Sequence, residues 1–138
     1  MSYALAESLQ SAIYQTLIGD VDLSALVQGA VYDEIPSGTL PETYVVLGSE
    51  TTVDRSDANS FGAEHRFTVS VLTSAGGFVQ AKRAASAVSD ALHQSDLTMT
   101  RGRLVYLNFE KASARRDSTA GLRRIDLRFR ARVEEEQP

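Results

Sequence analysis

The 138-residue chain contains no cysteine, only three prolines and no long apolar run. The absence of cysteine excludes a disulfide framework and a thiolate metal site, and it is compatible with a reducing compartment. The ordinary shares of apolar and charged residues argue against disordered and collagen-like chains. No segment approaches the roughly 20 apolar residues of a membrane span, and the opening stretch MSYALAESLQ lacks the basic start and apolar core of a secretory signal. We therefore expect a soluble cytoplasmic product.

Basic residues are scarce in the first hundred positions and crowded afterwards. Residues 1–100 carry four basic and twelve acidic side chains, whereas residues 101–132 carry ten basic and three acidic ones, and three glutamates follow. A charge division of this kind favours docking between complementary surfaces. It also fits a nucleic-acid-binding face, although the net charge of −4 weakens that interpretation.

Apolar residues at helical spacing predict two main helices and a shorter one. The first helix covers about residues 5–18 and stops at Gly19, a natural C-terminal residue. A short helix follows within residues 20–29. The third covers residues 74–94, where an alanine-rich apolar face predicts close packing and Ser74 is a candidate N-cap.

Alternating or continuous β-forming residues predict four strands, joined by turn-rich segments. The strands cover residues 43–48, 63–73, 105–109 and 125–133, and the polar segment 49–62 is expected to be a long exposed loop. A turn near Ser118 would place the apolar residues of the last two strands on a shared face. We therefore predict a single α+β domain over residues 1–138, with a mostly antiparallel sheet of about four strands and two main helices packed on one face.

The sequence gives no support to an enzyme. It contains no nucleophile, phosphate-binding, dinucleotide or zinc-protease motif, and its two histidines lie in different elements. His65 alternates with apolar residues and is expected in the core, whereas His93 ends the third helix, where a cation suits the helix dipole. Acidic pairs such as Asp54 and Asp57 fall in the expected loop and are best interpreted as solvated. We expect no catalytic, cofactor or metal site.

The segment GLRRIDLRFRARVEEE alternates arginine with apolar residues, and Asp126 interrupts the row. Three interpretations stay open for the row. The first is a solvated strand face whose charges discourage aggregation, and the second is a nucleic-acid-binding face. The third is a subunit interface in which arginine forms bidentate hydrogen bonds with a neighbour's carboxylates. Only Tyr106 among the nearby aromatics alternates to the polar side, which disfavours base stacking.

The order of several segments resembles the tail terminator, or tail-completion, proteins of long-tailed bacteriophages and phage-derived gene transfer agents. The segments are LQSAIYQTL, LSALVQGAVYDEIP, PETYVVLGSETTVDRSD and GAEHRFTVSVLTSAGGFVQAKRAASAVSDAL. The resemblance covers about residues 9–130. Its most specific parts are the VYDEIP turn, the YVVLG strand and the stretch from GAEHRFTV into the long helix.

The resemblance implies a structural protein with an antiparallel sheet and helices on one side. Members form a six-membered ring on the last ring of the tail tube, end tube polymerisation and join the tail to the neck, with DNA passing through the lumen. The implied partners are further copies of the chain, the tail tube protein, a neck or head-completion protein, and double-stranded DNA, without a membrane. The implied location is the tail–neck junction of a virion or gene transfer agent particle assembled in the bacterial cytoplasm.

A closed ring needs two different complementary patches on each subunit. As hypotheses, we assign subunit-interface or lumen roles to Arg124, Arg128, Arg130, Arg132, Asp54, Asp57 and Glu64. Contacts with the tail tube or neck are assigned to Arg115, Arg116 and Asp117. The alternatives are a nucleic-acid-binding accessory domain that uses the arginine row, or another head–tail joining ring.

Overall fold

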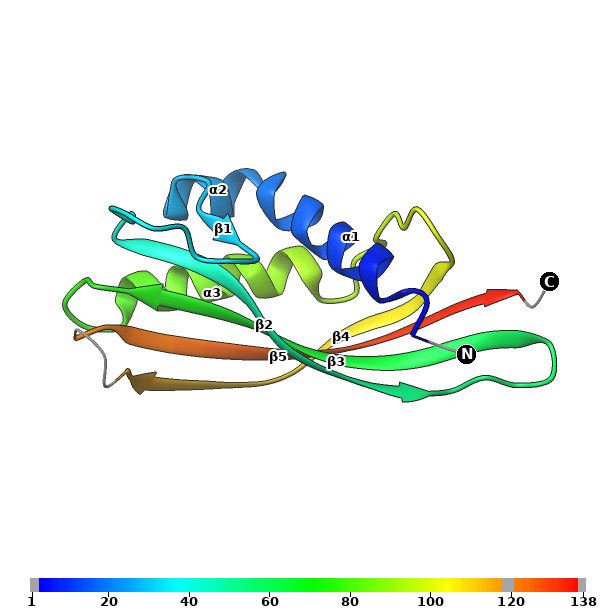
Figure 1. Ribbon diagram of the computed structural model, residues 1–138. Coiled ribbons are helices and arrows are strands. Elements are labelled where there is room, and N and C mark those ends of the chain that lie inside the picture. Colours follow the sequence, from blue (N-terminus) through cyan, green and yellow to red (C-terminus); the bar gives the residue numbers. More distant parts are fainter. Residues whose placement is uncertain (1–2, 118–120, 137–138) are drawn as a thin grey trace.

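The computed structural model describes residues 3–117 and 121–136 and shows an α+β fold (Figure 1). The elements follow the predicted order, with one additional strand. They are α1 (Ala6–Ile18), α2 (Val21–Val27), β1 (Val31–Tyr32), β2 (Thr43–Asp54), β3 (Ser60–Thr73), α3 (Val79–Leu92), β4 (Arg103–Arg116) and β5 (Arg123–Glu136).

The strands form one sheet in the order β1-β2-β3-β5-β4, and the helices lie together on one of its faces (Figure 1). Every neighbouring pair is antiparallel except β1 with β2, which is parallel. The expected sheet of about four strands therefore gains β1. This strand has only two residues, Val31 and Tyr32, which is too short for a periodic sequence signal.

The longest uninterrupted ladder joins β3 to β5. It runs over fourteen residue pairs, from Ser60 with Glu136 to Thr73 with Arg123, without a register shift. Because side chains alternate along a strand, one face of this ladder is apolar and packs under the helices. Val69 and Leu127 are opposite each other on that face and both are buried, as the alternation in the sequence predicts.

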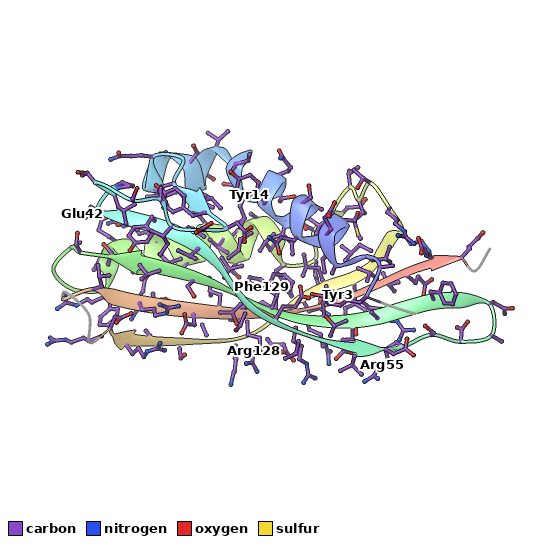
Figure 2. All side chains as sticks on the ribbon, viewed as in Figure 1. Tyr3, Tyr14, Glu42, Arg55, Arg128 and Phe129 are labelled. Atoms are coloured by element: carbon purple, nitrogen blue, oxygen red, sulfur yellow. The ribbon has the colours of Figure 1, made fainter. Side chains whose placement is uncertain are left out.

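Phe129 lies at the centre of the core and is fully buried between the sheet and the helices (Figure 2). Its ring stacks on Phe67 with centroids 5.5 Å apart and meets Phe109 edge-on at 5.8 Å. Opposite it, α3 buries mainly alanines, namely Ala81, Ala84, Ala85 and Ala87, with Val88 and Leu92. Small side chains let a helix approach the sheet closely, as the alanine-rich stripe predicts.

The prediction of a long loop over residues 49–62 is wrong. After a register shift between Leu47 and Glu50, β2 continues to Asp54, and β3 already begins at Ser60. This end of the hairpin reaches beyond the helices (Figure 1). Its strands are held by backbone pairing, and most side chains of β2 beyond the shift are at least partly exposed. Polar residues therefore form strands here without any apolar signal.

The prediction that Ser74 caps the third helix is also wrong. α3 begins at Val79 after Phe78, and no side chain caps its first turn. Ser74 instead donates its backbone N–H to the carbonyl of Glu42 at 3.0 Å. Gly77 has a φ of 80°, a left-handed conformation that glycine adopts without strain. The segment SAGG is thus a turn that precedes the helix.

The Phe129→Ala substitution should lower the free energy of unfolding by about 3–5 kcal/mol, because it leaves a cavity among buried aromatic rings. Urea denaturation followed by circular dichroism measures this loss. Phe109→Ala is the matched control, since Phe109 touches the same ring but is 37% exposed. Equal losses in the two variants would contradict the central place given to Phe129.

Candidate functional site

The arginine row lies on the face of the sheet that carries no helix. Because side chains alternate along β5, Ile125, Leu127 and Phe129 face the helices, and the arginines of the row face the opposite side. Figure 2 shows Arg128 pointing away from the helices. The register adds residues of β3 and β4 to the same face, among them Glu64, Arg66, Thr68, Ser70, Tyr106, Asn108, Lys111, Ser113 and Arg115. We call this surface the polar face.

Asp126, the interruption in the row, organises one end of the polar face. Its carboxylate accepts hydrogen bonds from the Ser70 hydroxyl at 2.6 Å and from Arg124 Nε at 2.8 Å, and it pairs with Arg115 at 2.9 Å. Burial alone raises the pKa of Asp126. The hydrogen bonds from Ser70 and Arg124 and the two arginine charges outweigh burial and hold that pKa below its usual value.

Two further members of the row also have partners within the chain. The Arg130 guanidinium lies 5.6 Å from the centroid of the Tyr106 ring, a cation–π contact. The Tyr106 hydroxyl donates to Glu64 Oε2 at 3.2 Å. Arg132 donates to the backbone carbonyl of Arg55 in the β2–β3 connection at 3.1 Å. Most of the row is therefore fixed in place by its own subunit.

Arg128 differs from the rest of the row. It is exposed, and it makes no hydrogen bond or ion pair with the part of the chain that the structure describes. Lys111 lies opposite it on β4 and is likewise exposed and without such a partner among those residues. Both line a hollow of about 300 Å³ whose other side chains come mainly from β3, β4 and β5. Among the described residues of the polar face, these two exposed cations are therefore available to an outside group.

The acidic residues assigned to a neighbour's contact lie close to the row in the same subunit. Glu64 stands opposite Arg132 in the β3–β5 ladder. Asp54 and Asp57 lie at the end of the β2–β3 hairpin, where they accept local hydrogen bonds. Backbone N–H groups of Asn59 and Ser60 lower the pKa of Asp57. The structure thus brings these residues together within one chain, and their contact across subunits remains a prediction.

The residues assigned to the tail tube or neck lie at the opposite end of the sheet, where β4 leads into β5 (Figure 1). Arg115 pairs with Asp126, and Asp117 lies 3.5 Å from Arg124. Arg116 is exposed and has no ion pair with any described residue. The expected turn centre at Ser118 falls outside the described residues. The assignment of these three residues to the tail tube or neck remains a prediction.

The histidines have structural positions. His65 is fully buried, as predicted, with Nδ1 3.3 Å from Glu50 and 3.1 Å from the Thr52 hydroxyl. His93 follows α3, and its Nδ1 accepts the backbone N–H of Phe109 at 3.0 Å. Over residues 3–117 and 121–136, no group of three or more acidic or histidine side chains is placed to hold a metal ion. Within the same ranges, no helix has the length and apolar character needed to span a membrane.

A groove between α1 and β2 was not predicted from the sequence. It has a volume of about 610 Å³, and its lining includes the carboxylates Glu7, Asp33 and Glu50 and the rings of Tyr3 and Tyr14. A hydrogen bond from His65 lowers the pKa of Glu50, although burial opposes it. The lining comes from three separate segments, so no local pattern marks it. Carboxylates beside aromatic faces suit a cationic side chain.

Replacing Asp126 by Asn should cost about 1–2 kcal/mol of stability near neutral pH, because charge-assisted hydrogen bonds become neutral ones. The carboxyl pKa is lowered in the folded state. Its contribution is therefore present above the unfolded-state pKa of about 3.9 and disappears as the pH falls through the folded-state value. The wild type should lose more stability than D126N between about pH 6 and about pH 3.

Thermal and urea unfolding across that pH range measure both effects. The control is Asp96→Asn, since Asp96 is exposed and makes no ion pair with the described residues. D96N should follow the wild-type pH dependence. An unchanged pH dependence in D126N would show that this network does not stabilise the fold.

Comparison with known proteins supports a structural role for this chain. The family model described as "Tail completion protein gp17" matches residues 11–134. A chain in the solved structure "Virion of native gene transfer agent (GTA) particle" is 57% identical, with a TM-score of 0.92, and the match covers 97% of this chain and 100% of that chain. No curated protein matches. Because the family match spans most of the sequence, the chain belongs to the tail completion protein gp17 family.

Proposed function

We propose that this tail-completion protein forms a hexameric ring at the head-proximal end of the tail tube in a virion or gene transfer agent particle. The ring ends tube polymerisation, joins the tail to the neck, and lets DNA pass through its lumen. It performs no catalysis. The proposed partners are other copies of the chain, the tail tube protein and a neck or head-completion protein.

The observation that carries this proposal is the nearly complete match to a chain of a gene transfer agent virion. The match covers 100% of that chain and 97% of this one at 57% identity. Nearly every element of this fold therefore has a counterpart in a chain of an assembled particle. The family model independently covers residues 11–134.

We further propose that the polar face borders the lumen. Arg124 is paired with carboxylates of its own subunit. A ring and a backbone carbonyl of the same subunit hold Arg130 and Arg132 in place, so these arginines have fewer free N–H groups with which to hold phosphate. Weak attraction suits a duplex that must slide through a channel, because each persistent phosphate contact would retain it. Lys111 and Arg128 add exposed positive charge to this face.

Tail tubes assembled with the purified protein should stop growing and carry a ring at one end. Tubes assembled without it should continue to elongate, because nothing covers the growing end. Electron microscopy of tube lengths and ends measures both effects. Tubes of unchanged length with bare ends would refute the role as terminator, and rings bound only to the isolated neck would favour another head–tail joining ring.

The accessory nucleic-acid-binding alternative makes a different prediction for the Lys111→Glu/Arg128→Glu variant. If the face is a binding site for duplex DNA, the wild type should bind with micromolar affinity, with a log–log salt slope of about 0.9 per phosphate contact. The variant would then lose most of this affinity. The lumen assignment predicts weak, non-saturating binding for the wild type at physiological salt. Fluorescence anisotropy with a labelled duplex distinguishes the two.

A further inference from the structure

Two strands, β2 and β4, each have a long stretch of outer edge that no described strand covers. β1 pairs with β2 at Val45 and Val46 alone. Within the described residues, no strand lies beside the outer side of β2 from Leu47 to Asp54. Open strand edges pair readily with other chains, and proteins that remain monomeric usually close them. We call residues 47–54 the open half of β2.

The other edge of the sheet, β4, is covered near its middle by the segment after α3. The backbone N–H of Gln94 donates to the carbonyl of Leu107 at 2.7 Å, and the N–H of Phe109 donates to His93 Nδ1 at 3.0 Å. From Glu110 to Arg116 every residue is exposed. No described segment pairs with the outer side of these residues. They form the open half of β4.

The strand directions make the two open halves compatible. β2 and β5 run one way, and β3 and β4 run the other, because each pair from β2 to β4 in the sheet is antiparallel. A rotation about an axis that runs roughly along the strands relates one copy to the next in a ring, and it preserves these strand directions. The β4 of one copy would then run antiparallel to the β2 of its neighbour, and the helices of both would stay on the same side.

We propose that the open half of β4 in one copy adds to the open half of β2 in the next, which joins the sheets of the ring. This inference rests on the proposed ring and names its subunit contact. The contact is heterologous, since two different edges meet, and a contact of this kind closes into a ring when the rotation permits.

The groove beside the open half of β2 gives this contact a specific partner. It lies on the helix side of the sheet, where Leu47 and Glu50 form part of its lining. On β4, Arg116 is in register with Arg123, whose guanidinium lies 5.6 Å over the Phe78 ring next to α3. Arg116 therefore also lies on the helix side. In the joined sheet it enters the neighbour's groove, near Glu7 and Asp33, and it does so in place of a contact with the tail tube or neck.

The open halves lie towards opposite ends of the sheet. Through the strand pairing, Asp54 lies in one row across the sheet with Ala63 and Val133. Arg116 lies in another row with Arg123 and Thr73, near the opposite end. Joined copies must therefore be staggered along the strands. A closed ring with this stagger has strands inclined to its axis, which is the arrangement that closed sheets adopt.

Disulfide trapping tests the strand contact, because the natural chain has no cysteine. Ser113→Cys on the open half of β4 is combined in turn with Ser49→Cys, Thr51→Cys or Val53→Cys on the open half of β2. Cysteines bond only when their Cα atoms lie within about 7 Å, so the three partners sample the possible registers. At least one pair should give a ladder of covalent oligomers up to six copies after mild oxidation.

The controls separate this contact from other contacts. Each single-cysteine variant should give no ladder, because one cysteine per chain links at most two copies. Asn108→Cys replaces Ser113→Cys in the matched control. Asn108 shares the face but lies between Leu107 and Phe109, which are bonded to the segment after α3. Rings of six copies in which none of the three pairs crosslinks would overturn the strand contact and leave the ring itself intact. Absence of any ring, with or without tail tubes, would instead refute the proposed function.

A charge exchange tests the groove and needs no assumption about register. Arg116→Glu alone, or Glu7→Lys with Asp33→Lys alone, should each weaken assembly at least tenfold, since like charges meet at every contact. All three positions are exposed, and thermal unfolding verifies that the variants fold. An equimolar mixture should restore rings in which the two variants alternate, because every contact then joins opposite charges. A mixture that assembles no better than its components would overturn the role of Arg116.

Discussion

The uninterrupted pairing of β3 with β5 is the constraint on which the rest of the structure depends. Along its fourteen pairs, every second side chain of each strand lies under the helices, and the side chains between them lie on the polar face. The register shifts of the described sheet lie in the β2–β3 ladder and in the β4–β5 ladder. Regular pairing at the centre thus fixes the positions of the core and of the arginine row. The irregularly paired strands, β2 and β4, are the ones with an uncovered outer edge.

The sequence predicted the parts of the fold that burial specifies. The α+β class, the element order, the alternation of β3 and β5 and the buried position of His65 follow from apolar periodicity, and the structure confirms them. It did not predict β1 or the extension of β2 to Asp54. Both form by backbone pairing with an existing strand, which leaves no apolar pattern in the side chains. The start of α3 was misplaced because the segment SAGG resembles a helix cap but forms a turn.

Apolar periodicity in the sequence predicted only part of the candidate site. Alternation placed the arginine row on one face, but it could not show which arginines have partners, because partners are set by register across strands. Asp126 reaches Ser70 and Arg115 on neighbouring strands, and Arg130 reaches Tyr106 diagonally across the β4–β5 ladder. The groove beside α1 had no local signal, since three separate segments line it. Charge division along the chain predicts two complementary surfaces, and their contact across subunits stays a prediction.

The particle mass of the assembly is the most direct test of the closed ring. It is measured over a concentration series at low and high salt, for the protein alone and for the protein bound to tail tubes. A closed ring predicts one discrete species of six copies of the 15.0-kDa chain. High salt should dissociate part of this species, because charged groups contribute to the contact. A monomer under all these conditions, or a fixed assembly of two copies, would contradict a closed ring built from heterologous contacts.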